Sequence, residues 1–192
     1  MQRAVELPLF PLQTVLYPGG RLALRIFETR YLDMISRCMR DGGDFGVVAI
    51  ASGAEVGEAE THAVGTRAAI VDWERLPDGL LGITVSGGAR FRLQGIRRNA
   101  DGLYVGTAVP CTEESPVELP AEARGLAELL RRALTRVGRA DEVAGGRFAD
   151  ASWVSYRLAE VLPLTLADRQ RLLEEDDALA RLAMLGASMR IE

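Results

Sequence analysis

Lysine is absent from this chain of 192 residues, in which all 23 basic side chains are arginines. An arginine guanidinium stays protonated, so it cannot serve as the base of a Ser-Lys pair or form a Schiff base. A phosphate-binding loop of the Walker type also needs a lysine to reach the terminal phosphates. The sequence therefore excludes ATP hydrolysis by that route, Ser-Lys peptidase chemistry and pyridoxal phosphate enzymes.

Histidine and cysteine are almost as scarce, with His62 as the one histidine and Cys38 and Cys111 as the two cysteines. A zinc triad cannot be built from a single histidine. We interpret His62 as a surface loop residue, and Cys38 as a buried thiol on an apolar helix face. Cys111 lies in a linker with no base near it in sequence. We therefore predict no catalytic, cofactor-binding or metal-binding residue in this chain.

Long apolar runs and a basic surplus are missing too. No stretch approaches the ~20 apolar residues that span a membrane, and the N-terminal apolar run is too short for a signal peptide. The net charge of −4 and the pI near 5.2 argue against general binding to nucleic acid or anionic membranes. Two distant cysteines fit a reducing cytoplasm, and the arginine-rich, lysine-free usage fits a GC-rich bacterial coding sequence. We expect a cytoplasmic protein without membrane, nucleotide or nucleic-acid partners.

The most specific pattern in the chain is residues 7–39, LPLFPLQTVLYPGGRLALRIFETRYLDMISRCM. It begins as a short apolar strand, which Pro8 and Pro11 are expected to stop. After a Tyr-Pro-Gly-Gly turn, apolar and arginine residues alternate over 21–26, which predicts a strand. The period then becomes helical, which predicts a helix at about 28–40.

The next seventy or so residues have the pattern of short strands separated by turns. Residues 45–50 form an apolar run typical of a strand buried on both faces. The Leu-Pro-Asp-Gly sequence at 76–79 predicts a hairpin, and Gly87-Gly88 is expected to break its returning strand. Such short strands with regular turns indicate a small barrel or a folded-over sheet.

A proline- and glutamate-rich segment, PCTEESPVELP at 110–120, separates this part from a helical one. Beyond it, apolar residues recur at helical spacing. The sequence thus predicts an α+β protein with a β-rich half at 1–116 and a bundle of helices at 117–192.

The sequence of residues 7–39 closely resembles the start of the Lon protease N-terminal domain, LPLFPL…VLFPG…LPLRIFE.RY..M. Tyr17 stands for the usual Phe, and Ala23 for the usual Pro. The stretches GTRAAIVDWERLPDGLLGITVSGGARFRL and SWVSYRLAEVLPLTLADRQRLLEEDDALARLAML resemble later parts of the same domain. The resemblance implies a substrate-recognition domain whose β half is a pseudobarrel similar to the PUA fold. Full-length Lon proteins carry an ATPase module and a Ser-Lys peptidase after it. We expect here the domain alone, without enzymatic activity.

Three functions follow as hypotheses. The first is binding of polypeptide segments through an apolar groove or a sheet edge, with Tyr17 and Trp73 as candidate partner-binding residues. The second is RNA binding, because PUA-like barrels often bind RNA and Arg132, Arg136 and Arg139 share a helical stripe. We interpret that stripe as a solvated helix face, and the acidic balance argues against RNA. The third, a hydrolase with an unrecognised site, has no motif to support it.

Overall fold

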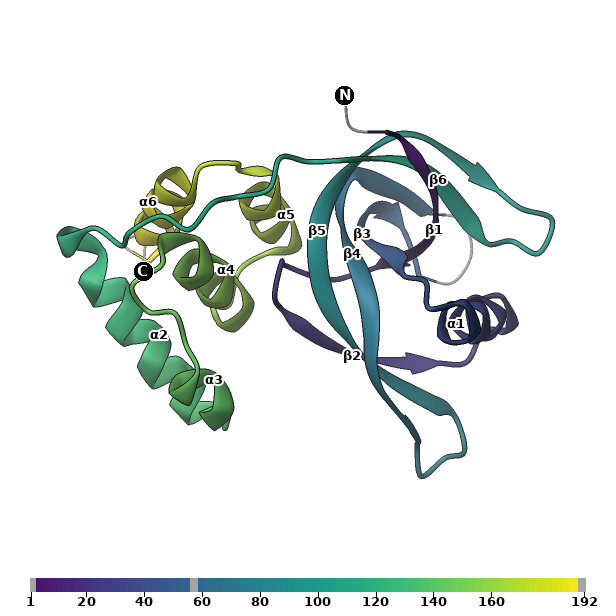
Figure 1. Ribbon diagram of the computed structural model, residues 1–192, viewed down its shortest axis with the longest axis horizontal. Coiled ribbons are helices and arrows are strands. Elements are labelled where there is room, and N and C mark those ends of the chain that lie inside the picture. Colours follow the sequence, from purple (N-terminus) through teal and green to yellow (C-terminus); the bar gives the residue numbers. More distant parts are fainter. Residues whose placement is uncertain (1–2, 56–58, 190–192) are drawn as a thin grey trace. The chain divides into compact units, whose positions relative to one another are not determined.

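The computed structural model describes residues 3–55 and 59–189. The chain divides into two compact units, Met1–Glu113 and Glu114–Glu192. The first contains a mixed sheet with a helix and the second contains helices (Figure 1). The division falls inside the proline-rich segment 110–120, a few residues before the sequence-based boundary at 116. The predicted α+β class, with strands first and helices second, is confirmed.

The first unit is a closed sheet. Its elements are β1 (Val5–Leu12), β2 (Arg21–Ile26), α1 (Thr29–Asp41), β3 (Phe45–Gly53), β4 (Ala59–Arg75), β5 (Leu81–Arg98) and β6 (Tyr104–Pro110). The strand order is β2-β5-β4-β3-β1-β6, and β5 also pairs with β6. The strands from β5 through β6 therefore form a ring, and β2 extends the sheet from the first part of β5. Only the β1–β3 pair is parallel among these pairings.

Helix α1 forms where the sequence period predicts it, because Tyr31, Ile35 and Cys38 fall on one face and are buried together. Gly42 ends the helix in the left-handed region at φ 67°, which glycine adopts without steric cost. The buried face packs into the larger apolar core of this unit, which it shares with β-strand residues such as Phe10. The ring of Phe10 stacks on Tyr31 with the ring centroids 3.9 Å apart.

Two expectations about where strands end are wrong. Pro8 and Pro11 both lie inside β1. Pro8 pairs only with β6, and Pro11 pairs only with β3. Each proline therefore has one side without a partner strand, where its nitrogen, which carries no hydrogen, breaks no hydrogen bond of the sheet.

The Gly87-Gly88 pair does not break β5, which runs through it to Arg98. Instead, the backbone of the turn after β1 pairs with Gly87, whose amide donates to the Gly20 carbonyl at 2.8 Å. A Cβ at Gly87 would lie 2.1 Å from the Tyr17 carbonyl oxygen. This glycine is therefore required for close backbone approach.

The second unit is a bundle of helices. Its elements are the 3-10 turn η1 (Ala121–Ala123) and the helices α2 (Arg124–Arg136), α3 (Ala140–Ala144), α4 (Ala151–Val161), α5 (Leu166–Glu174) and α6 (Ala178–Ser188). Asp150 caps α4 and Thr165 caps α5, each by accepting hydrogen bonds from backbone amides of the first turn. Helices α2, α4 and α6 bury leucines at 0% exposure, among them Leu134, Leu158 and Leu185. No helix in the described residues is long and apolar enough to cross a membrane.

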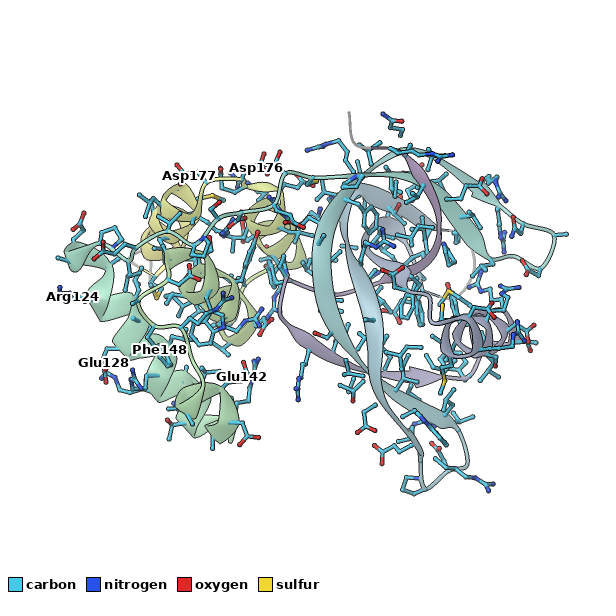
Figure 2. All side chains as sticks on the ribbon, in the orientation of Figure 1. Arg124, Glu128, Glu142, Phe148, Asp176 and Asp177 are labelled. Atoms are coloured by element: carbon cyan, nitrogen blue, oxygen red, sulfur yellow. The ribbon has the colours of Figure 1, made fainter. Side chains whose placement is uncertain are left out.

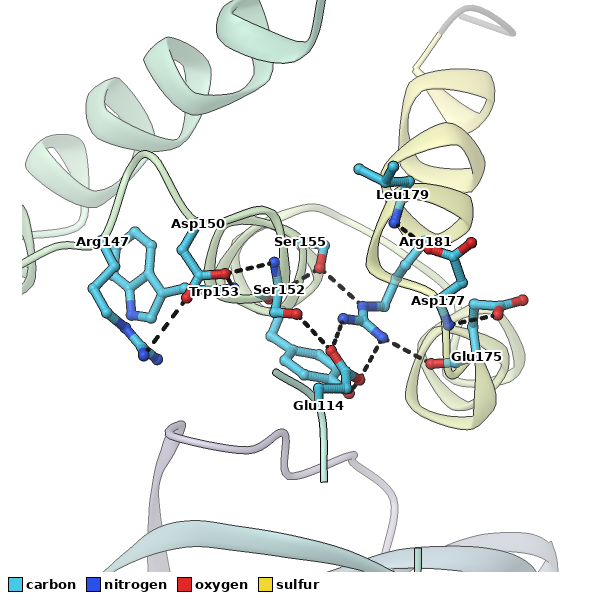
Figure 3. A network of polar contacts seen from close by, with 11 residues as sticks. Glu114, Arg147, Asp150, Ser152, Trp153, Ser155, Glu175, Asp177, Leu179 and Arg181 are labelled. Carbon is cyan, nitrogen blue, oxygen red and sulfur yellow. Dashed lines mark hydrogen bonds and ion pairs between the residues drawn. The ribbon is translucent and has the colours of Figure 1, made fainter. Parts of the chain in front are cut away.

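A buried ion pair joins the start of this unit to its last helix (Figure 3). The fully buried guanidinium of Arg181 donates to both carboxylate oxygens of Glu114, at 2.9 and 2.6 Å. The hydroxyls of Ser152 and Tyr156 also donate to that carboxylate. Burial alone raises the pKa of Glu114, but the hydrogen bonds from Arg181, Tyr156 and Ser152 outweigh it and hold this pKa below its usual 4.5.

Candidate functional site

The two aromatic residues proposed from sequence lie in opposite environments. The Trp73 side chain is 60% exposed on β4, whereas Tyr17 is 0% exposed. Tyr17 is folded inward because its turn is fastened by the hydrogen bonds between the backbone of residues 19 and 20 and that of Gly87. The expectation that Tyr17 presents an anchor on the surface is therefore corrected, while Trp73 has the required exposure.

Trp73 borders a groove of about 470 Å³ between the end of α1 and β4. We call it the α1–β4 groove, and its lining residues are Cys38, Met39, Gly42, Gly43 and Ala69 to Trp73. Three large apolar side chains in this lining are exposed, at 44% for Met39, 52% for Val71 and 60% for Trp73. Large apolar side chains gathered in this way on a protein surface are typical of a site that another molecule covers.

The β4 side of the groove is also an open sheet edge. β3 begins at Phe45, opposite Ala68, so the antiparallel strand β4 continues past the start of β3. From Ala69 to Arg75, β4 pairs with β5 alone among the described strands. A strand edge of this kind offers backbone donors and acceptors to a further extended segment.

The backbone at Trp73 faces this open edge. Trp73 lies opposite Ile83 of β5, yet its amide donates to the Asp72 carboxylate oxygen Oδ1 at 2.8 Å. The Leu76 amide donates to the Leu80 carbonyl, so the alternation of an antiparallel ladder turns the Trp73 amide, three residues earlier, away from β5. The Asp72 carboxylate that accepts from this amide therefore lies on the side of the open edge. A register shift between Ile70 and Asp72 marks a bulge at Val71, which increases the local twist of the strand.

The other side chains that could take part in a reaction do not form a reactive centre within the described part of the chain. Burial raises the pKa of the Cys38 thiol, and nearby Asp44 adds to the effect, so Cys38 is a poor nucleophile in the groove floor. His62 is half-buried within β4 rather than in a loop, which corrects that interpretation. Among the described residues, no group of three or more histidine, cysteine and acidic side chains is placed to hold a metal ion.

The predicted arginine stripe is only partly present. Arg132 and Arg136 are exposed on α2, which also carries Arg124 and Glu128 (Figure 2). Arg139 lies beyond the end of α2, where its guanidinium donates to Glu142 and, at 2.9 Å, to Glu160.

Two further arginines, Arg97 and Arg98 near the β5–β6 turn, are likewise engaged. Arg97 forms an ion pair with Glu6, and the Arg98 guanidinium lies over the Tyr104 ring. A depression of about 420 Å³ beside them has polar and charged walls that include Glu60, Arg97 and Arg98. It differs from the α1–β4 groove in its three charged lining residues, where the groove has Asp72 alone.

Comparison with known proteins settles the family. The family model for the ATP-dependent protease La (LON) substrate-binding domain matches residues 6–190. The chain belongs to the family of Lon substrate-binding domains. It is 32% identical to "Lon protease 2" of Herpetosiphon aurantiacus and 28% identical to "Lon protease" of Escherichia coli K12, in each case over 98% of this chain. It spans only about a quarter of the length of these relatives, 24% and 25% respectively.

Solved structures give the same assignment. A Lon N-terminal domain protein from Xanthomonas campestris superposes with a TM-score of 0.81 and 40% identity, covering 95% of this chain and 98% of that one. The N-terminal domain of a Mycobacterium avium complex Lon protease has a TM-score of 0.68 and 18% identity, covering 94% and 96% of the two chains. The latter shares the fold. The family predicted from residues 7–39 is thus confirmed.

Proposed function

We propose that this Lon-type domain binds extended, apolar polypeptide segments in the α1–β4 groove, without catalysing a reaction. The observation that carries the proposal is the placement of exposed Met39, Val71 and Trp73 in one groove that is bordered by the open strand edge of β4. Family membership supports the same role, since the matched module is described as substrate-binding. We place this activity in a bacterial cytoplasm, on the composition of the chain.

The proposed binding uses two kinds of contact. The edge of β4 from Ala69 to Arg75, apart from the Trp73 amide that Asp72 engages, supplies backbone hydrogen bonds, which any peptide sequence can satisfy. Met39 and Trp73 supply apolar surface, which favours segments that are normally buried in a folded protein. Sequence-tolerant pairing combined with a preference for apolar side chains suits a domain that recognises unfolded chains.

No described contact favours the RNA alternative. Several of the arginines that could face phosphates are neutralised by carboxylates, as in the pairs Arg67–Asp44 and Arg97–Glu6. A nucleic-acid site would need a surplus of unpaired positive charge on one face.

The test is binding of a fluorescein-labelled apolar peptide of about eight residues, ~27 Å long when extended, measured by fluorescence anisotropy. Trp73→Ala should weaken binding about 5- to 30-fold, the loss of 1–2 kcal/mol expected for an aromatic anchor. Phe27→Ala is the matched control, because Phe27 is 57% exposed and outside the groove lining. It should leave the affinity unchanged.

Two further readouts locate the site. Trp153→Phe leaves Trp73 as the sole tryptophan, whose emission should shift when peptide fills the groove. Affinity for an uncharged peptide should also change little between about 50 and 300 mM salt, because apolar burial is not screened. Equal effects of Trp73→Ala and Phe27→Ala, or a steep loss of affinity with salt, would contradict the proposal.

A further inference from the structure

We infer that the α1–β4 groove selects apolar segments that carry a basic side chain, which the carboxylate of Asp72 recognises. This inference rests on the proposed function and adds to it a charge preference. It follows from the contrast between the many apolar groups of the groove and its single charged lining residue, Asp72.

The position of the Asp72 carboxylate is fixed by its hydrogen bond. Oδ1 accepts from the Trp73 amide at 2.8 Å, and that amide faces the open edge where a bound segment would lie. Only Oδ1 is used in this contact, and within the described part of the chain Oδ2 has no hydrogen-bond donor. One oxygen therefore holds the carboxylate in place while the other is available to a ligand.

The negative charge of Asp72 is also not neutralised by the protein. The acidic residues at the nearby end of α1 have arginine partners, since Asp41 pairs with Arg40 and Asp44 pairs with Arg67. Asp72 is exposed and has no arginine within ion-pair distance among residues 3–55 and 59–189. A carboxylate of this kind beside an apolar surface complements an ammonium or guanidinium group on an otherwise apolar partner.

This arrangement distinguishes the inferred ligand from a purely apolar one. A segment with only apolar side chains would pack on Met39 and Trp73 but leave the Asp72 charge partly desolvated and unpaired, which is unfavourable. A lysine or arginine in the segment can lay its aliphatic stem along the apolar lining and bring its charge to Oδ2. A segment with an acidic residue at that place would be repelled.

The experiment compares two apolar peptides that differ only in having lysine or glutamine at the central position. Both have acetylated and amidated ends, which removes the terminal charges. At low salt the lysine peptide should bind the wild-type domain about two- to five-fold tighter, the range expected for a partly exposed ion pair. This preference should shrink as salt is added.

Two isosteric variants assign the preference to one carboxylate. Asp72→Asn retains an oxygen that can accept from the Trp73 amide but removes the charge, so it should abolish the lysine preference. Glu74→Gln removes the same charge from an exposed residue of β4 outside the groove lining, so it should preserve the preference. Circular dichroism and thermal melting establish that both variants are folded.

The possible results distinguish a failure of the inferred charge preference from a failure of the proposed polypeptide binding. Equal affinities of the two peptides for wild type, or an unchanged preference in Asp72→Asn, overturn the inference and leave polypeptide binding standing. An equal loss of preference in Glu74→Gln also overturns it, because the effect would then reflect overall charge. If neither peptide binds, the proposed function itself fails, and the inference with it.

Discussion

Replacement of Glu114 by alanine should strongly destabilise the helical unit. The Glu114 carboxylate is the only ion-pair partner of Arg181 among the described residues, and the Arg181 side chain is 0% exposed. The same carboxylate accepts hydrogen bonds from the hydroxyls of Ser152, at 2.7 Å, and Tyr156. Removing it therefore leaves a buried guanidinium without its counter-charge and two hydroxyls without this acceptor (Figure 3).

The size of the effect follows from that geometry. Removing one partner of a buried ion pair costs about 3–5 kcal/mol, most of it because the remaining charge stays buried. The Glu114 side chain is 15% exposed, so water can reach the vacated space, and we expect the lower end, about 3 kcal/mol. A change of this size lowers the melting temperature of a small domain by roughly 12 °C or more.

Urea unfolding measures this effect in the helical unit by itself. A Trp73→Phe background leaves Trp153 on α4 as the only tryptophan, so its emission reports that unit alone. Glu128→Ala is the matched control, because Glu128 forms an exposed pair with Arg131, 3.8 Å away, and should cost less than about 1 kcal/mol. If Glu114→Ala destabilised the unit no more than Glu128→Ala, the reasoning about the buried pair would be wrong.

Two further predictions concern pH and packing. Since the folded-state pKa of Glu114 lies below its usual 4.5, the folded state binds its proton less tightly than the unfolded chain. The stability advantage of wild type over Glu114→Gln should thus be complete above about pH 5 and should decline as the pH falls below about 4.5, in urea titrations at each pH. Gly87→Ala should destabilise the first unit by about 1–3 kcal/mol or prevent its folding, because the added Cβ meets the Tyr17 carbonyl oxygen at 2.1 Å. Gly95→Ala on the same strand has nothing within 4 Å of its Cβ and should be nearly neutral in the same thermal melt; equal effects of the two would refute the close-approach argument.

Local features of the chain could be predicted from sequence because they depend on neighbours in sequence. The helical period of Tyr31, Ile35 and Cys38 gives the buried face of α1, and the glycine that follows gives its end. The cap at Thr165 is likewise a contact across three residues, with Asp168 supplying the amide. In each case the deciding interaction lies within a few positions along the chain.

Features that depend on pairing between distant strands could not be predicted in this way. From sequence alone, Pro8 and Pro11 predict the end of a strand. Only the pairing of β1 with β6 and then with β3 shows that each proline has one unpaired side. The Gly87-Gly88 pair resembles a strand break until the turn containing Tyr17 is seen to pair with it. Each of these residues has its role through a partner that lies far away in sequence, and no local pattern identifies that partner.

The same reasoning explains why one of the two aromatic candidates became a site residue and the other did not. Tyr17 and Trp73 both stand beside polar or turn-forming residues, so their sequence surroundings do not separate them. Tyr17 is buried because its turn is fastened to β5, whereas Trp73 is exposed because β4 runs past the start of β3 at Phe45. The groove and its open edge therefore arise from the unequal lengths of β3 and β4. A variant that lengthened β3 toward Trp73 would close the edge, and it should remove peptide binding while Met39 and Trp73 are still present.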